Sequence, residues 1–542
     1  DIYQDLNIGS TIIDAILRDW KGLRIEGGYV DYEDLQEMLY QECYVRNNPE
    51  VINFIKERYN MIYIDEFQDT SQIQYKLIKV YGADCKQVLA IGDDDQTIYS
   101  WRGSCNDIIL RDFIEDFEPK LNQLSVNYRC PANILNSIKP SIELNQDRFE
   151  KQLHSHREGG EVRYGLFGSY ISMLNILGDL IYKDVSNGLS VAVLCRVNSD
   201  GLMPAIIFDT LNSFQFSISG EGMTLNSYIG RAVVGICKLF TERSTQAVKN
   251  ALGFLTWDSR GINEMIKTFK NNGTSIWTVP LDDLYYSCSD VAHCVSEWRT
   301  WRDSAGDIEA LKRVLQYYRT RVFSKDSQFN DVMRSAIISI ESLLGYYDYD
   351  SVDDFVEALE DINERLKARI GKSKGASVQI ATVHEFKGKE SDSVYVWNDT
   401  EEVFPHKNCN IYNQSELEEE RRVHYIACTR PKKILTLLSL RDKQGRFTFE
   451  MDLSGANMLE IGLSGSLAKK KVEEDSNLER FARQATLDGN DEEQVGNREG
   501  VVENSSPQEE PKYPYEPVPE EIPDSTPDFS DGALFSENPF WE

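Results

Sequence analysis

The stretch from Met61 to Ser104, MIYIDEFQDTSQIQYKLIKVYGADCKQVLAIGDDDQTIYSWRGS, decides the fold of this chain. Residues 61–64 and 88–91 are too short for helices and too apolar for loops, so they predict two buried strands of a parallel sheet. Ligands of such sheets bind beyond the carboxyl ends of the strands. We therefore expect an α/β fold whose functional site follows these two strands.

Polar residues follow both predicted strands. Asp65 and Glu66 come directly after the first, and the sequence Asp-Asp-Asp-Gln at residues 93–96 follows the second. Two adjacent carboxylates suit a magnesium nucleotide: Asp65 would hold the ion and Glu66 would take a proton from an attacking water. Gln96 would position that water or sense the terminal phosphate. A single Asp-Glu pair is typical of a solvated turn, but two polar clusters one helix apart favour a nucleotide site.

Residues 65–70, DEFQDT, resemble the Walker B motif of the UvrD/Rep family of superfamily-one DNA helicases, and residues 92–103, GDDDQTIYSWRG, resemble the next motif of that family. The resemblance implies RecA-like parallel-sheet motor domains of the P-loop NTPase type, with ATP and Mg²⁺ as cofactors. It also implies that Tyr99, Trp101 and Arg102 lie where the ATP site meets the single-stranded DNA track. Aromatic faces stack on any base, at about 1–3 kcal/mol per base. Packing of Trp101 in a domain core is the alternative.

Residues 127–131, NYRCP, follow an expected strand at residues 121–126 and resemble a further motif of the family. The resemblance implies that Tyr128 packs on adenine and that Arg129 reaches the terminal phosphate. An exposed Arg outside such a motif is usually a surface ion-pair partner.

Two more segments continue the series of motifs. Residues 378–382 predict a strand, and TVHEFKGKE at residues 382–390 resembles the motif that couples DNA to ATP, which implies that Thr382 and His384 face DNA and Glu390 contacts the ribose. Residues 418–430 predict a helix capped at Ser415 and resemble the last motif. Arg430 would then be an arginine finger, a group that contributes about 10³ to 10⁵ in rate. Outside this motif His384 would be read as a structural residue.

The remaining pattern predicts the organisation of the chain. Residues 309–318, 331–344 and 352–370 read as helices. The expected parts are a helical remnant of the first inserted subdomain (1–60), the C-terminal part of the first RecA-like domain (61–118), the first part of the second RecA-like domain (119–241), a helical accessory subdomain (242–376), the second part of that domain (377–455) and an acidic disordered tail (456–542).

The sequence GxxxxGK[ST], whose backbone amides cradle phosphates, does not occur in these 542 residues. Together with residue 1 being Asp, this leads us to expect the C-terminal portion of a helicase lacking the Walker A region. Such a portion would be inactive as an isolated fragment, and an N-terminal helicase fragment would bind in trans.

The composition of the chain limits its possible location and the kinds of site it can carry. Apolar content of 41% and charged content of 27% are typical of a soluble globular protein, and no apolar run reaches the roughly 18 residues of a membrane span, so we expect no membrane contact. The ten scattered cysteines favour a reduced cytosolic compartment without a zinc or iron–sulfur site. Residues 456–542 carry 7 Lys and Arg against 21 Asp and Glu, so −14 of the net charge of −31 lies there and −17 in the rest. Any DNA site must therefore be a local groove lined by particular side chains.

The functional hypothesis is an ATP-dependent 3′-to-5′ DNA helicase of repair or replication, acting on single-stranded DNA and on junctions with duplex. Its expected location is the cytosol of a bacterial or phage-infected cell, or the nucleoid. The tail mixes acids with aromatics at residues 527–542, which suggests a docking motif for a protein partner. The alternatives are a plain solubilising tail and a mimic of DNA charge that competes for the DNA groove of the same chain. The alternative function is a catalytically inactive DNA-binding or regulatory protein derived from a helicase.

Overall fold

The structure is a computed structural model, and it describes residues 10–211, 214–241, 245–256, 258–324, 328–346, 349–372, 375–401 and 403–459. Within these residues the chain forms two compact units. Unit 1 comprises residues 10–93 and 99–113, and unit 2 comprises residues 94–98 and 114–459. The predicted acidic tail lies outside the described residues from residue 460 onward.

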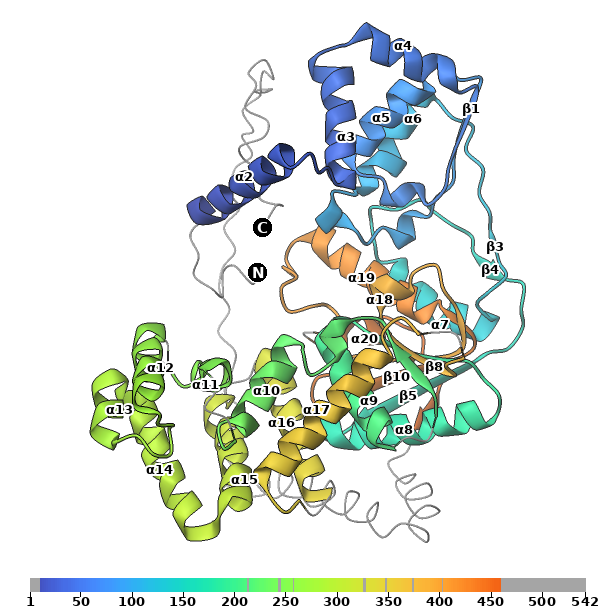
Figure 1. The fold of residues 1–542 in the computed structure, drawn as a ribbon. Helices are drawn as coiled ribbons and strands as arrows, with labels where there is room; N and C mark the ends of the chain where they lie inside the picture. The colour runs from blue at the N-terminus through green and yellow to red at the C-terminus, as the bar shows by residue number, and fades with distance from the viewer. Residues whose placement is uncertain are drawn as a thin grey trace, which may run out of the picture. The chain divides into compact units, whose positions relative to one another are not determined.

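Unit 1 consists of a small parallel sheet with helices before, between and after its strands (Figure 1). The strands are β1 (Met61–Ile64) and β2 (Gln87–Ala90), which pair in parallel. The helices are α2 (Ser10–Glu26), α3 (Tyr32–Tyr40), α4 (Pro49–Arg58) and α5 (Gln72–Gly82). Both strands and their parallel pairing were predicted, with β2 starting one residue earlier than expected.

Alternate side chains of β1 and β2 are exposed and the others are half-buried, contrary to the prediction of buried strands. Met61 is 52% exposed and Tyr63 61%, and Leu89 and Ile91 are exposed as well. The reason is that a strand is buried only when other elements cover its faces, and unit 1 supplies only two strands among its described residues. Helix α3 likewise begins after Asp31, whose carboxylate accepts a hydrogen bond from the Asp34 backbone N–H at 2.8 Å, but its Leu35 side chain remains exposed.

Unit 2 contains a seven-stranded parallel sheet, ordered β11-β5-β10-β9-β6-β8-β7. The strands are β5 (Glu161–Phe167), β6 (Val191–Cys195), β7 (Phe216–Ile218), β8 (Val378–Thr382), β9 (Ser391–Val396), β10 (Pro431–Leu440) and β11 (Asn457–Leu459). Every residue of strand β6, in the interior of the sheet, is buried. Strand β11 falls within the first residues of the stretch predicted as a tail.

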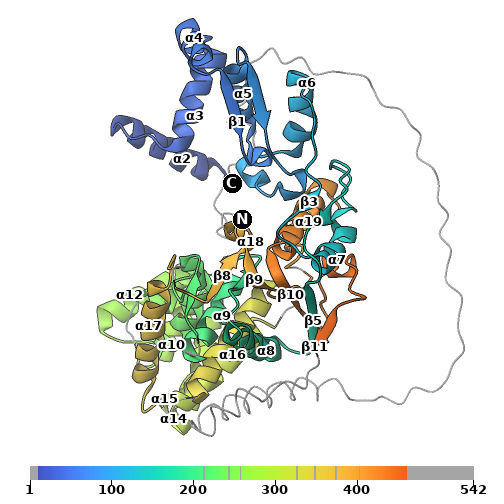
Figure 2. The ribbon, with the colours of Figure 1, turned by 90° about the vertical axis from the view of Figure 1, so that its right-hand side faces the viewer.

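Helices pack on both faces of this sheet (Figure 2). α8 (Tyr170–Ser186) and α9 (Asn198–Leu211) pack against each other and against the sheet, and α7 (Ala132–Ile142) packs with α19 (Gln414–Cys428). The short helices are α6 (Phe113–Phe117), α18 (Val383–Phe386) and α20 (Arg446–Phe449). This alternation of strand and helix is the expected α/β architecture with parallel sheets, as in RecA-like domains.

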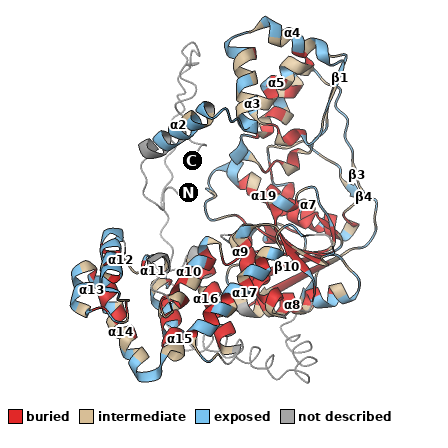
Figure 3. Ribbon diagram, in the orientation of Figure 1, coloured by how far each residue is buried: buried red, intermediate tan, exposed pale blue. Residues whose placement is uncertain are grey.

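The segment between β7 and β8 is helical in its described residues. Its helices are α10 (Tyr228–Lys238), α11 (Thr245–Leu252), α12 (Ser259–Asn272), α13 (Leu281–Ser287), α14 (Ser289–Ala305), α15 (Asp307–Tyr317), α16 (Gln328–Tyr346) and α17 (Val352–Ala368). The three helices predicted here correspond to α15, α16 and α17. The core of the sheet continues without a break into these helices, and in Figure 3 red segments of α10 and α16 stand among tan and pale blue ones.

One predicted strand is mostly absent. Only Val126 and Asn127 of the expected strand at residues 121–126 form β3 (Val126–Asn127), which pairs with β4 (His154–Ser155). Leu121 and Leu124 are exposed and have no neighbouring strand, so apolar composition alone misled the prediction. No helix within the described part of the chain is both long and apolar enough to cross a membrane.

Candidate active site

The carboxylates predicted to hold the metal and the attacking water lie at the end of β1. Asp65 and Glu66 are both exposed there, and the Asp65 carboxylate accepts a hydrogen bond from the Glu66 N–H at 2.9 Å. The Glu66 backbone has φ 49° and ψ 43°, a left-handed conformation that a residue with a Cβ seldom adopts. Strain of this kind is concentrated at functional sites.

A buried glutamine joins this pair to the polar cluster after β2. Gln68 donates a hydrogen bond to Glu66 Oε2 at 2.6 Å and accepts one from the Asp93 N–H at 3.0 Å. Gly92 permits this approach, because a Cβ there would lie 2.8 Å from Gln68 Oε1. Gln68 was not among the predicted site residues, although it lies inside DEFQDT. The sequence feature that could have identified Gln68 is its position between two carboxylate clusters, because its amide can donate a hydrogen bond to one cluster and accept one from the other.

The ligand chemistry of Asp65 and Glu66 fits Mg²⁺, which binds through one or two carboxylates together with substrate phosphates. Three or more His, Cys, Asp or Glu side chains suitable for a metal do not gather anywhere in the described residues. A cation here would thus be shared with a ligand. Asp65 remains the predicted metal contact.

The aromatic residues of the second motif form one cluster in unit 1. The rings of Tyr99 and Trp101 meet edge to face with centroids 6.3 Å apart, and the Arg102 guanidinium lies 4.5 Å from the Trp101 centroid. Trp101 is 57% exposed, so packing in a domain core does not account for it. Its partners within unit 1 orient the ring, while its surface remains accessible.

Gln96, unlike its neighbours Asp93 and Tyr99, belongs to unit 2. Lys387, from the segment after α18, donates a hydrogen bond from Nζ to the Gln96 backbone oxygen at 2.9 Å. Gln96 is therefore held beside the motif at residues 382–390.

Arg129 and Glu390, predicted to contact the terminal phosphate and the ribose, lie together in unit 2. Arg129 Nε donates to Glu390 Oε2 at 3.0 Å, and Lys432 Nζ lies 3.6 Å from Glu390 Oε1. The Arg129 hydrogen bond holds the pKa of Glu390 below its usual range. Tyr128, predicted to pack on adenine, is 68% exposed and has the ring of His156 5.0 Å away.

Arg430 follows α19 and is buried, with 2% of its surface exposed. Its Nε donates to the Ile426 backbone oxygen at 3.0 Å, and its Nη2 donates to Thr429 Oγ1 at 3.3 Å. Burial raises the pKa of the Cys130 thiol to about 12, and the positive charges of Arg430, Arg129 and Arg157 act in the opposite direction. Three guanidinium groups thus gather around Cys130, which gives this part of unit 2 the positive charge that an anion requires.

Thr382 and His384, predicted to face DNA, flank the start of α18. Thr382 is buried and caps this helix, because its Oγ1 accepts a hydrogen bond from the Glu385 N–H at 3.3 Å. Burial and the nearby Arg196 charge lower the pKa of His384 to about 4. His384 is therefore neutral at neutral pH, and any DNA contact it makes is a hydrogen bond rather than an ion pair.

Two details of the last motif differ from the prediction or extend it. The cap of α19 is Asn413, whose side chain accepts from the Ser415 N–H at 3.1 Å, rather than Ser415 itself. Arg422 forms an ion pair within the helix with Glu418 at 3.4 Å, whereas Arg421 pairs with Glu450, 29 residues away.

The predicted site residues thus form two groups. Unit 1 carries Asp65, Glu66, Tyr99, Trp101 and Arg102, and unit 2 carries Gln96, Tyr128, Arg129, Thr382, His384, Glu390 and Arg430. The tripeptide Gly371-Lys372-Ser373 has the ending of a phosphate loop, but Leu366 stands where the first glycine is required and α17 precedes the tripeptide instead of following it.

Two domain families match this chain. The UvrD/REP helicase N-terminal domain matches residues 9–118, and the UvrD-like helicase C-terminal domain matches residues 300–442. The N-terminal match includes the carboxylates of unit 1. The expectation of a C-terminal portion alone therefore finds no support.

Similar proteins include a probable DNA helicase II homolog of Rickettsia felis, which is 26% identical over 75% of this chain and 64% of its own length. A putative ATP-dependent DNA helicase of Bacillus subtilis is 26% identical over 78% of this chain and 56% of its own length. DNA helicase II of Escherichia coli is 26% identical over 76% and 59%. The chain thus spans 56–64% of the length of these relatives. The chain thus resembles both domains of UvrD/REP-type DNA helicases, over residues 9–118 and 300–442.

Proposed function

We propose that this protein hydrolyses ATP with Mg²⁺ and uses the reaction to move 3′ to 5′ along single-stranded DNA and to separate the strands of a duplex. The observation that carries the proposal is the arrangement of Asp65, Glu66 and Gln68 after β1. Two exposed carboxylates follow a parallel strand, one of them in a left-handed backbone conformation, and a buried amide ties it to the end of the next strand.

In this proposal the residues of unit 1 act on the attacking water. Asp65 holds the magnesium ion, and Glu66 accepts a proton from the water, with its carboxylate kept in place by the Gln68 amide. When bound, Mg²⁺ would neutralise charge on the phosphates. Positioning by Gln68 is what separates this arrangement from an ordinary solvated turn.

The residues of unit 2 provide positive charge and nucleotide contacts. Arg129 and Arg430 face developing phosphate charge, Tyr128 offers an exposed ring to adenine, and Glu390 reaches the ribose. Arg129 is paired with Glu390, and Arg430 with Ile426 and Thr429, so binding of a phosphate by either arginine competes with these contacts. The proposal thus includes a rearrangement of these two side chains on nucleotide binding.

Single-stranded DNA is the proposed second substrate, and Trp101 is the contact best supported. Its exposed ring, with Arg102 beside it, has the chemistry that stacks on a base of any sequence. Tyr99, Thr382 and His384 complete the proposed track. The acidic charge of the chain as a whole predicts that binding depends on these local contacts.

We further propose that a phosphate-binding loop of the GxxxxGK[ST] type, lying outside these 542 residues, works with the residues of unit 1. The exposed apolar side chains of β1 and β2 support this, because the helices that connect additional parallel strands would cover the faces of the sheet. The same loop supplied on a second polypeptide is one way to provide it.

The test is ATP hydrolysis with and without single-stranded DNA, measured for residues 1–542 alone and with a polypeptide that carries the loop. Glu66→Gln removes the proposed base and keeps its size, so we expect kcat to fall by about 10² to 10⁴. Glu57→Gln on α4 is the matched control, since Glu57 is also an exposed carboxylate of unit 1.

Loss of hydrolysis in Glu66→Gln with full activity in Glu57→Gln supports the proposal. Hydrolysis that survives Glu66→Gln excludes Glu66 as the base. If no combination hydrolyses ATP while DNA still binds, the protein is a DNA-binding regulator derived from a helicase.

A further inference from the structure

A five-residue segment inside the second motif is held by unit 2, although the residues on either side belong to unit 1. The chain passes from unit 1 to unit 2 between Asp93 and Asp94 and returns between Ile98 and Tyr99. Asp94, Asp95 and Ile98 are buried, and Gln96 lies among them. Something in unit 2 must therefore satisfy two buried carboxylates.

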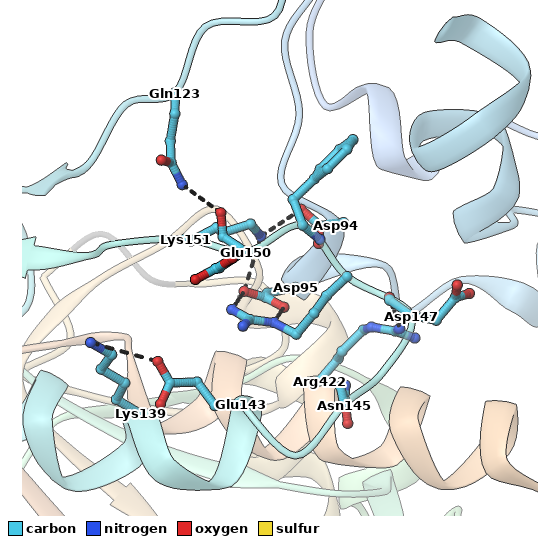
Figure 4. A network of polar contacts seen from close by, with 12 residues as sticks. Asp94, Asp95, Gln123, Lys139, Glu143, Asn145, Asp147, Glu150, Lys151 and Arg422 are labelled. Atoms are coloured by element: carbon cyan, nitrogen blue, oxygen red, sulfur yellow. Dashed lines mark hydrogen bonds and ion pairs between the residues drawn. The ribbon is translucent and has the colours of Figure 1, made fainter. Parts of the chain in front are cut away.

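The partners are two cations from the loop between α7 and β4 (Figure 4). Arg148 binds Asp95 with both ends of its guanidinium, Nε to Oδ1 at 2.9 Å and Nη2 to Oδ2 at 2.7 Å. Lys151 Nζ lies 2.9 Å from Asp95 Oδ2 and 2.5 Å from Asp94 Oδ1. The Phe149 N–H also donates to Asp94 Oδ2 at 2.8 Å. We name Asp94, Asp95, Arg148 and Lys151 the acidic clamp.

The geometry of the acidic clamp makes it rigid. A guanidinium and a carboxylate joined by two parallel hydrogen bonds fix direction as well as distance. Opening the clamp inside the protein would leave buried charges without compensation, which is strongly unfavourable. The direct contact with Asp95 raises the pKa of Arg148, so this side chain stays charged at every physiological pH.

The loop that supplies the cations is itself fixed to α19. The Glu418 carboxylate accepts hydrogen bonds from the backbone N–H groups of Gln146 and Asp147 at 2.7 and 3.2 Å. Arg422, one turn further along α19, donates to the Asp147 backbone oxygen at 3.0 Å. Helix α19 then ends at Cys428, two residues before Arg430.

We propose that Arg148 and Lys151 are positioning residues that hold Gln96 in a fixed relation to α19 and therefore to Arg430. The inference rests on the proposed function, in which Gln96 senses the terminal phosphate and Arg430 stabilises its charge. With the acidic clamp closed, these two groups move as parts of one body. Lys387, which donates to the Gln96 backbone oxygen, supports the same segment from a second side.

The test compares two substitutions, each of which replaces a positively charged side chain with methionine. Lys151→Met removes one of two cations on the buried Asp95, and Arg365→Met removes one of two cations on the buried Asp209, which Arg369 continues to bind at 3.1 Å. Both variants lie in unit 2, and each affected carboxylate keeps a polar partner: Arg148 for Asp95, the Phe149 N–H for Asp94 and Arg369 for Asp209. Arg148→Lys, which keeps the charge but loses the two-point contact, is the second clamp variant.

We expect Lys151→Met to lower kcat for DNA-stimulated ATP hydrolysis by about tenfold to a hundredfold with little change in KM, since small misplacements of a positioned group have effects of this size. If Lys151 acts through Gln96, the double variant Lys151→Met with Gln96→Ala will be no slower than Gln96→Ala alone. The effects of Arg365→Met and Gln96→Ala will instead multiply.

Hydrogen exchange without nucleotide separates this inference from the proposed function. Lys151→Met and Arg148→Lys should speed exchange at residues 94–98, and Arg365→Met should not. If the wild-type chain hydrolyses ATP but Lys151→Met matches Arg365→Met in exchange and kinetics, the inference is overturned. If no ATP is hydrolysed in any combination, the proposed function fails and the role in hydrolysis fails with it, whatever the exchange shows of the clamp.

Discussion

The two-stranded sheet of unit 1 and the seven-stranded sheet of unit 2 contain similar apolar parallel strands in very different surroundings. β1 and β2 of unit 1 expose Met61, Tyr63 and Leu89, whereas all five residues of β6 in unit 2 are buried. In Figure 3 the difference is visible between the pale blue of α2 and α4 and the red around β10. Whether an apolar parallel strand is buried therefore depends on the layers that pack around it and is not determined by its own sequence.

The chemistry of the two units differs in the same sense. The open sheet of unit 1 carries solvated carboxylates, Asp65 and Glu66, in a position where a ligand can reach them. The covered sheet of unit 2 supports buried charges such as Asp95 and Arg430, which need partners to remain charged. Exposed carboxylates are accessible to a metal ion or a nucleotide, whereas buried and paired charges fix the positions of the elements that carry them.

The largest expected effect comes from matched truncations in the two sheets. Leu194→Ala in β6 removes a fully buried side chain, so we expect the free energy of unfolding to fall by about 2–5 kcal/mol. Leu89→Ala in β2 shortens a side chain that is 39% exposed, and we expect a loss below about 1 kcal/mol. Urea unfolding followed by circular dichroism measures both. Equal losses would mean that β2 is covered in solution and would remove the contrast between the sheets.

A smaller effect is expected from the buried carboxyl of Asp200, in the first turn of α9. Its two carboxyl oxygens have no hydrogen-bond partner among the described residues, and burial raises its pKa to about 7 from an ordinary 3.8. A raised folded-state pKa contributes stability at low pH that is lost as pH rises toward 7. Asn does not ionise, so Asp200→Asn avoids this loss. The free energy of unfolding of Asp200→Asn minus that of wild type should therefore be about 2–3 kcal/mol larger at pH 8 than at pH 5.

Paired urea titrations at the two pH values check this prediction. His384 and His406, whose pKa falls from an ordinary 6.5 to about 4 on folding, also make stability depend on pH in this range, but they are present in both proteins, so their contributions cancel in the difference. The same relative stability at pH 5 and pH 8 would show that Asp200 is solvated or paired in solution.

The smallest effect on stability is expected on the exposed side of β1. Replacing Met61 and Tyr63 with Thr removes exposed apolar surface, and we expect each replacement to change the free energy of unfolding by no more than about 0.5 kcal/mol. Self-association should decrease, because an open apolar sheet is a site for pairing with other chains. Sedimentation velocity measures this. The control is Val191→Thr with Val193→Thr in β6. These replacements should unfold the protein and should not reduce its self-association.

Local patterns in the sequence predicted the elements well and their surroundings poorly. β1, β2 and the capped start of α3 follow from short-range rules, and the buried stripe of α17, with Phe355 and Leu366, follows from its helical period. The strand expected at residues 121–126 was wrong because strand formation needs a neighbour that the local sequence does not specify.

The contacts that organise the candidate site were the least predictable. Asp95 binds Arg148 and Lys151, 53 and 56 residues further along the chain, and nothing in the local pattern around Asp95 identifies them. Gln68 was missed although its neighbours were named, because an amide is uncharged and does not belong to the patterns that identify metal ligands or catalytic bases. The pairing of Arg129 with Glu390 was likewise outside the reach of spacing rules, although both residues had been assigned to one ligand.

The acidic clamp also sets an order of events during synthesis of the chain. Asp94 and Asp95 leave the ribosome before Arg148 and Lys151 exist, and Glu418, which fixes the loop that carries these cations, follows some 270 residues later. At about 5–20 residues per second, the two carboxylates therefore remain in water for several seconds before their partners appear, and for longer before α19 is complete. Unit 1 can form most of its structure in that time, but residues 94–98 reach their final place only when nearly all of unit 2 has been made.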